Sequence, residues 1–190
     1  MSSARNLSVI LVTDRSLWGK LVTEHARSVG FKVRHFAWEH GDEAVPRGLG
    51  GWRGDWILGF KADYILSSAE LRQATAGALN FHPGPPDLRG VGTYQIALAE
   101  RRSAYGVTCH HMVERVDFGQ IVDIAEFPIP AHVDRLALHE LAAGRLYTLY
   151  VRIIALLESG IALPSSERGW SGRLHTWRES EARVTDHPCR

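Results

Sequence analysis

Cysteine is scarce in this chain, which has two among 190 residues, Cys109 and Cys189. They lie far apart and form no C-x-x-C pair, which argues against a disulfide framework or a zinc ribbon and predicts two thiols in a reducing compartment. Long apolar runs are missing too. The opening residues MSSARNLSVILV lack the extended apolar stretch of a signal peptide, and no window approaches the roughly 18 apolar residues of a membrane span. We therefore expect a soluble, cytoplasmic protein with no membrane partner.

A surplus of charge of either sign is also absent. The formal net charge is +1, from 22 Lys and Arg against 21 Asp and Glu, and neither sign forms a long block. A surface that binds nucleic acid gathers positive charge along the phosphates, so no nucleic-acid partner is expected. The chain is 45% apolar and has six Trp, enough to bury the core of one domain. These features favour a small substrate.

Strand-like and helix-like segments alternate along most of the chain. Apolar runs and alternating patterns predict strands over 7–12, 31–38, 55–60, 78–81, 106–113 and 120–129. Helical spacing and capping residues predict helices over 17–29, 67–76, 93–102 and 135–158, with a Gly- and Pro-rich loop over 41–54. This order predicts an α/β fold of three layers, Rossmann-like, with a mostly parallel sheet. The composition becomes polar and Arg-rich after Pro164, so residues 1–160 are expected to form the domain and 161–190 a tail or small appended element.

Asn80 and His82 come at the end of a predicted strand, directly before the sequence Pro-Gly-Pro-Pro. On extended backbone their side chains leave the same face, while Phe81 points the other way. Ligands of open α/β sheets usually bind beyond the carboxyl ends of the strands, so an amide and an imidazole are expected to share a pocket there. The alternative is structural: Asn80 stabilises its own turn and His82 is a hydrogen-bonded histidine at a rim.

Asp117 lies in a strand-to-strand loop, two residues before Gly119. Alone, this D-x-G pattern is typical of a turn. Together with Asn80 and His82 it predicts an amide donor, an imidazole and a base around one reacting carbonyl. A zinc site is disfavoured, because adjacent strand residues face opposite ways and no H-x-E accompanies the candidate ligands. Those ligands are His82, Cys109, His110 and His111. We therefore expect no metal.

The chain resembles the formyltransferase domain shared by methionyl-tRNA formyltransferase, glycinamide ribonucleotide formyltransferase and the sugar N-formyltransferases. The resemblance covers about residues 55–125 and rests on four motifs in the same order and spacing. They are Asn80-x-His82-Pro83, Arg89-Gly90, the strand Gly-Val-Thr-x-His that ends at His110, and Asp117-x-Gly119. The sequences HPGPP and GVTCHHM are most similar to those of the sugar N-formyltransferases, which act on amino groups of nucleotide-linked amino sugars.

The resemblance implies a sheet of the formyltransferase type and transfer of the formyl group of N10-formyltetrahydrofolate to an amine, expected to be a dTDP- or GDP-linked amino sugar. It implies that Asn80 donates to the formyl oxygen and that a cationic His82 stabilises the oxyanion. Asp117 would orient His82 and help to move the proton from the amine to N10. Ile65, Leu66, Arg115 and Val116 would line the pteridine pocket, and His110 would support Asp117 from behind. A homodimer is compatible with the resemblance.

Other functions remain open from the sequence. The same three side chains could serve a formyltetrahydrofolate hydrolase, a formyltransferase for another small amine, or a noncatalytic folate-binding module. A tRNA substrate is disfavoured because 190 neutral residues leave no room for a tRNA-binding domain. A phosphoribosyl substrate is also disfavoured, because no Gly-rich phosphate loop follows the first strand.

Overall fold

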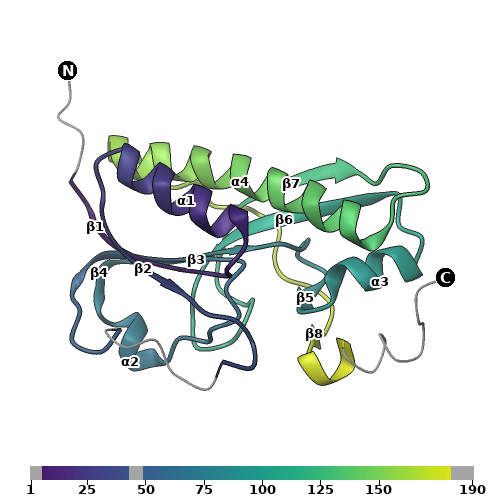
Figure 1. Ribbon diagram of the computed structural model, residues 1–190, viewed down its shortest axis with the longest axis horizontal. Helices are drawn as coiled ribbons and strands as arrows, with labels where there is room; N and C mark the ends of the chain where they lie inside the picture. The colour runs from purple at the N-terminus through teal and green to yellow at the C-terminus, as the bar shows by residue number, and fades with distance from the viewer. Residues whose placement is uncertain (1–5, 43–48, 181–190) are drawn as a thin grey trace.

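The fold is built around a six-stranded sheet with the order β2-β1-β3-β4-β6-β7 (Figure 1). The computed structural model describes residues 6–42 and 49–180. The strands are β1 (Ser8–Thr13), β2 (Lys32–Ala37), β3 (Gly54–Phe60), β4 (Ala74–His82), β6 (Ala104–His111) and β7 (Ile121–Pro128). The first four run parallel, and β6 and β7 are antiparallel additions at one edge. The predicted mostly parallel α/β sheet is confirmed.

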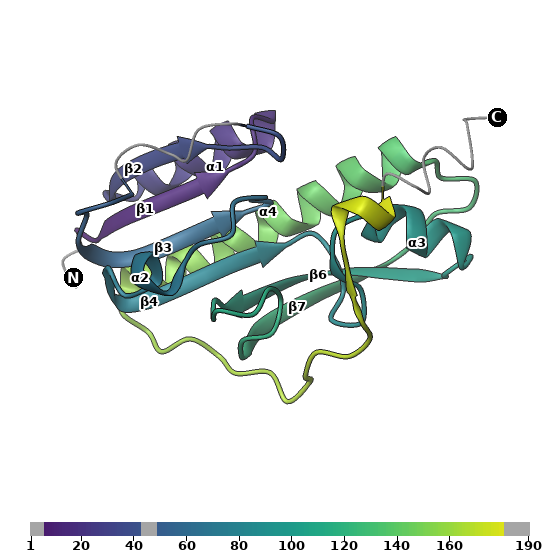
Figure 2. The ribbon, with the colours of Figure 1, turned by 90° about the horizontal axis from the view of Figure 1, so that it is seen from below.

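Helices and loops cover both faces of the sheet. α1 (Leu17–Ser28) and α4 (Arg135–Ser159) lie side by side on one face (Figures 1 and 2). Asp134 caps α4 through a hydrogen bond from the backbone N–H of Ala137 (2.8 Å), and Gly160 ends the helix in the left-handed conformation. The other face is covered by the one-turn α2 (Ser68–Leu71) and by loop residues such as Trp52.

The predicted helix over 67–76 is wrong beyond its first turn. The capping box is present, since Ser67 Oγ accepts from Glu70 N–H and the Glu70 carboxylate accepts from Ser67 N–H. The chain nevertheless becomes strand β4 at Ala74, because residues 74–77 pair with β3. Gly77 lies inside this strand, against the ring of Trp56, and so does not end a helix. Sheet pairing outweighs the weak helical preference of the Ala-Thr-Ala-Gly segment.

Other predicted boundaries shift by a few residues. α3 spans Thr93–Ala99, not 93–102, and β6 ends at His111, two residues early. The predicted loop over 41–54 includes residues 43–48, which lie outside the described residues, as does Cys189. Cys109 is fully buried. No helix in the described part of the chain is long and apolar enough to cross a membrane.

The segment after α4 folds back against the domain (Figure 2). Its strand β8 (Leu174–His175) pairs in parallel with β5 (Arg89–Gly90) in a separate two-stranded sheet. The backbone N–H of Ser166 also donates to the carbonyl of Ile121 (2.9 Å). Residues 161–180 therefore reach the strand ends where the candidate site lies, and the division at residue 160 stays a prediction.

Candidate active site

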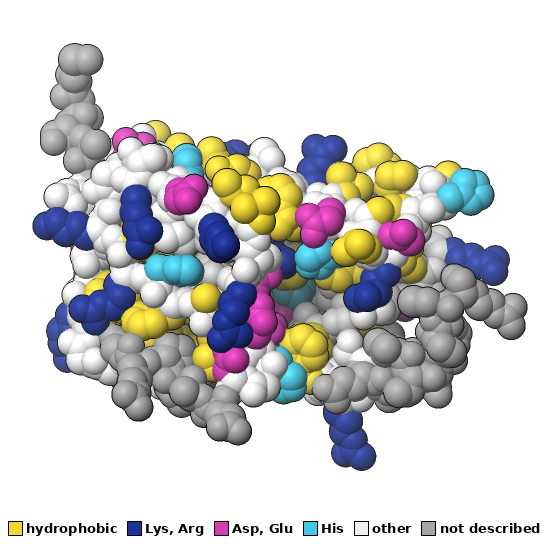
Figure 3. All heavy atoms as spheres, in the orientation of Figure 1, with side chains coloured by type: hydrophobic (Ala, Val, Ile, Leu, Met, Phe, Trp, Pro, Cys, Tyr) yellow, Lys and Arg dark blue, Asp and Glu magenta, His cyan; other side chains and the backbone are white. Residues whose placement is uncertain are grey.

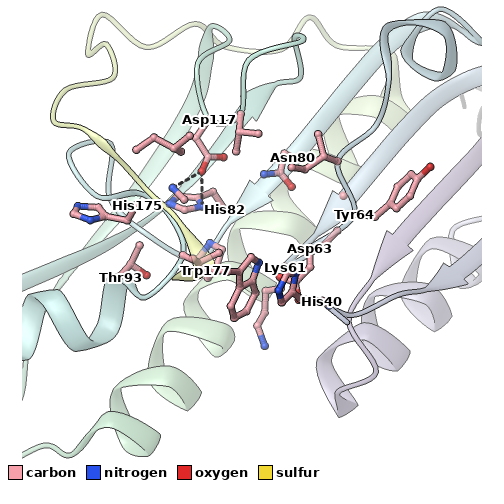
Figure 4. Close-up of a pocket in the computed structure, with 18 of the residues that line it drawn as sticks. His40, Lys61, Asp63, Tyr64, Asn80, His82, Thr93, Asp117, His175 and Trp177 are labelled. Atoms are coloured by element: carbon pink, nitrogen blue, oxygen red, sulfur yellow. Dashed lines mark hydrogen bonds and ion pairs between the residues drawn. The ribbon is translucent and has the colours of Figure 1, made fainter. Parts of the chain in front are cut away.

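Strand β4 delivers Asn80 and His82 to a cavity of about 820 Å³ at its carboxyl end (Figure 4). The space-filling view shows acidic and histidine side chains around a recess near the middle of one face (Figure 3). The antiparallel register of β4 and β6 pairs Asn80 with His110. The structure thus brings the two residues predicted from the alternation of strand side chains together with His110, which was predicted to lie behind Asp117.

Asp117 lies between two imidazoles. Its Oδ2 is 3.4 Å from Nδ1 of His82 and its Oδ1 is 3.2 Å from Nε2 of His110. The backbone N–H of Gly90 also donates to Oδ2 (2.7 Å). We call Asp117, His82 and His110 the Asp117 cluster; each is at most 4% exposed. A dashed line in Figure 4 joins Asp117 to His82, on the same side of the cavity as Asn80.

The electrostatic environment keeps Asp117 ionised. Burial alone would raise the pKa of this carboxyl group. The charge of His82, the hydrogen bond and charge of His110 and the Gly90 N–H together hold the pKa of Asp117 well below its usual range. At neutral pH Asp117 is therefore a fixed negative charge that orients the two imidazoles.

Buried Arg89 holds the loop that carries Asp117, which we call the Asp117 loop (residues 112–120). Its Nε donates to the carbonyl of Asp117 (2.7 Å) and its Nη2 to the carbonyl of Val116 (3.0 Å). Asp117 itself has a φ of 45°, in the left-handed region, where Asp is among the better tolerated residues. The sequence marked Arg89-Gly90 as a motif without a role. The structure gives both residues hydrogen bonds to Asp117 or its loop.

Gly119 lets the Asp117 loop pass close to β6. A Cβ at this position would lie 1.9 Å from the carbonyl oxygen of His111. We expect Gly119→Ala to lower the free energy of unfolding by about 1–3 kcal/mol, because backbone atoms must move apart. Urea unfolding measures the change, with Gly169→Ala as control because no atom lies within 4 Å of a Cβ there. Equal stability of the two variants would contradict the close approach.

Both ring nitrogens of His82 face acceptors. Nδ1 is directed at Asp117, and Nε2 lies 2.8 Å from the carbonyl oxygen of Leu88. Nδ2 of Asn80 lies 3.2 Å from Nε2 of His110. His82 must therefore exchange a partner before it donates to a ligand, whereas the Asn80 amide has a second N–H that can donate without leaving His110.

The residues predicted to bind folate line the same cavity as the Asp117 cluster. Leu66 is buried against the sheet, whereas Ile65 is 67% exposed at the rim. Arg115 and Val116 line it from the Asp117 loop, and the Arg115 guanidinium lies 3.6 Å from the centroid of the Phe118 ring. This side of the cavity therefore combines apolar side chains with one cation, Arg115, at its edge.

The other end of the cavity holds groups that the sequence did not single out. Lys61, directly after β3, forms a largely buried ion pair with Asp14 (2.8 Å). The imidazole of His40 stacks on the indole of Trp177, with ring centroids 4.6 Å apart and planes within 6°. Figure 4 shows this pair near Lys61, across the cavity from Asp117. These residues come from segments far apart in the sequence, and no motif links them.

Within residues 6–42 and 49–180, no group of three or more His, Cys, Asp or Glu side chains is arranged to hold a metal ion. Cys109 is one of the four candidate zinc ligands considered from the sequence. Its side chain is buried, and burial raises the pKa of its thiol well above the usual value.

The chain is similar to known formyltransferases in sequence and in fold. A family model described as formyl transferase matches residues 39–154, more than half of the chain. Among solved structures, the formyltransferase PseJ of Anoxybacillus kamchatkensis, in complex with a UDP-linked formamido sugar and tetrahydrofolate, has a TM-score of 0.71 at 18% identity, covering 93% of this chain and 90% of its own.

Two further solved structures share the fold. The N-formyltransferase of Helicobacter canadensis, in complex with folinic acid and dTDP-3-aminofucose, has a TM-score of 0.72 at 14% identity, covering 90% of this chain and 71% of its own. A 4-N formyltransferase of Francisella tularensis has a TM-score of 0.74 at 14% identity, covering 91% of this chain and 77% of its own. At such low identity these likenesses establish a common fold.

Proposed function

We propose that this chain, which belongs to the formyl transferase family, transfers the formyl group of N10-formyltetrahydrofolate to the amino group of a small molecule. The observation that carries the proposal is the Asp117 cluster, which lies with Asn80 along one cavity of about 820 Å³. That volume falls within the range of cavities that hold cofactor-sized ligands.

The reaction needs charge stabilisation at one oxygen and one proton transfer. The amine attacks the formyl carbon, a C–N bond forms, and the formyl oxygen gains negative charge. When the tetrahedral intermediate collapses, the bond from carbon to N10 breaks and N10 gains a proton that the amine loses. The N–H groups of Asn80 and His82 would donate to the developing oxyanion. Asp117 would keep the imidazole of His82 oriented and its charge stabilised.

One contact must change when substrate binds. The Asn80 amide has two N–H groups and can donate one to the formyl oxygen while Nδ2 stays near Nε2 of His110, whereas Nε2 of His82 leaves the carbonyl of Leu88. Hydrogen bonds at catalytic sites commonly realign when substrate binds, so these partners are compatible with the proposed roles.

The two ends of the cavity suggest where each substrate binds. Folate would occupy the wall of Ile65, Leu66, Arg115 and Val116. The acceptor would enter beside Lys61, Thr93 and Trp177, where charged, hydroxyl and aromatic groups line the cavity. A nucleotide-linked amino sugar fits this mixture of groups, and related folds were solved with such sugars bound. A homodimer in the cytoplasm remains part of the proposal.

Release of tetrahydrofolate from N10-formyltetrahydrofolate tests the function. The reaction is followed with a panel of dTDP-, UDP- and GDP-linked amino sugars, other small amines and a control without acceptor. Release that requires one amino sugar supports the transferase and identifies its acceptor. Release without any acceptor points to a hydrolase. If no release occurs, titration with folate alone separates a binding module from a protein without folate affinity.

A further inference from the structure

Trp170 contacts the Asp117 cluster from the tail. Its indole centroid lies 4.8 Å from the His110 ring at an angle of 89° and 5.9 Å from the His82 ring at 67°. Its Nε1–H donates to the carbonyl oxygen of Gly119 (2.7 Å), inside the Asp117 loop. One side chain therefore contacts both imidazoles beside Asp117 and the backbone that carries Asp117.

The indole lies behind the reacting groups. His82, His110 and Asp117 all line the cavity, whereas Trp170 is not among the lining residues. It therefore contacts the cluster from a side that substrate does not reach. An apolar ring in that position excludes water from a carboxylate and two imidazoles, and charge interactions strengthen where water is excluded.

We propose that Trp170 is a positioning residue for formyl transfer, whose indole fixes the Asp117 loop and shields the Asp117 cluster from water. This inference rests on the proposed function. The chemistry stays with Asn80, His82 and Asp117. Trp170 acts through them, since it touches their rings and backbone but does not line the cavity.

The tail has other attachments, so the indole can be changed without releasing the segment. Ser166 donates its N–H to Ile121, Arg168 pairs with Glu126 (2.7 Å), and β8 pairs with β5. A loss of activity on changing Trp170 can therefore be separated from detachment of the tail. Arg168→Ala is the matched control, because it removes a tail contact on the exposed surface away from the cluster.

The kinetic test uses the full chain with Trp170→Leu and Trp170→Phe. We expect Trp170→Leu to lower kcat about 10- to 100-fold with KM for folate within about threefold, because the reacting groups are displaced while the folate wall is unchanged. Trp170→Phe keeps a ring beside the imidazoles and loses the N–H, so it should recover part of kcat. Arg168→Ala should keep the wild-type kcat. If both Trp170 variants keep kcat within about twofold, the inference is wrong.

A spectroscopic test does not require turnover. A ring N–H that is hydrogen-bonded and shielded from water exchanges slowly and gives a resolved proton signal in NMR. We expect such a signal from His82 in the native protein and in Arg168→Ala, and its loss in Trp170→Leu. If the native protein transfers no formyl group to any acceptor, the proposed function fails and this signal alone decides the role of Trp170. An unchanged His82 signal in Trp170→Leu would contradict the proposed role of Trp170.

Discussion

Replacing Asn80 by alanine is expected to lower kcat for formyl transfer about 100- to 1000-fold, in line with the loss of one oxyanion donor. Asn80 lines the cavity at the end of β4, and Nδ2 of its side-chain amide lies 3.2 Å from Nε2 of His110. The fold should persist, because the side chain packs only partly into the core and its truncation opens toward the cavity. Initial rates at saturating folate and acceptor measure the effect.

A matched amide elsewhere serves as the control for Asn80. Gln73 lies between α2 and β4 and does not line the cavity. Gln73→Ala should therefore leave kcat within about twofold of the native value. Near-normal turnover in Asn80→Ala would contradict the role of the Asn80 amide as an oxyanion donor, whatever the control shows.

Asp117→Asn is expected to lower kcat about 10³- to 10⁴-fold, the size of effect seen when a buried carboxylate that orients a catalytic histidine loses its charge. The amide has the shape of the carboxylate and its oxygen can still accept from Gly90 N–H. The charge beside both imidazoles is lost. Asp123→Asn is the control, because Asp123 pairs with Arg152 outside the cavity. Equal rates for the two variants would contradict the role of Asp117.

The difference in stability between the native protein and Asp117→Asn should depend on pH in one direction. The pKa of Asp117 is lower in the folded protein than in the unfolded chain, so its ionised form stabilises the fold above the unfolded value, near 4. This contribution, on the order of 2 kcal/mol, is lost as the pH falls through the folded pKa. The difference in unfolding free energy between native protein and Asp117→Asn should be largest at pH 6–7 and shrink below about pH 4. A constant difference across this range would mean that folding does not lower the pKa of Asp117.

Local patterns predicted the parts of the site that depend on one strand or one motif. The two-residue period of an extended chain places Asn80 and His82 on one face, and both line the cavity. The resemblance to the formyltransferase family predicted that His110 lies behind Asp117, and the structure brings the two side chains within hydrogen-bonding distance of each other. The buried strand β1 and the capped helix α4 follow directly from their apolar patterns.

Other parts depend on tertiary contacts that no local pattern encodes. Residues 74–77 look like the end of a helix, and only pairing with β3 makes them a strand. The indole of Trp170 reaches Gly119 across 51 residues of chain, and the imidazole of His40 stacks on the indole of Trp177, which is distant in the sequence. The polar composition predicted a tail or small appended element, and no local pattern shows that Trp170 contacts the Asp117 cluster or that Trp177 lines the cavity.

Transfer of an isotopically labelled formyl group tests the central claim most directly. N10-formyltetrahydrofolate labelled at the formyl carbon is incubated with the protein and the acceptor panel, and the products are separated and identified by mass spectrometry. Asp117→Asn measures the background. The account predicts label in a formamide of one small amine, at a rate that falls to background in the variant. Label found only in formate, or equal rates for native protein and variant, would contradict it.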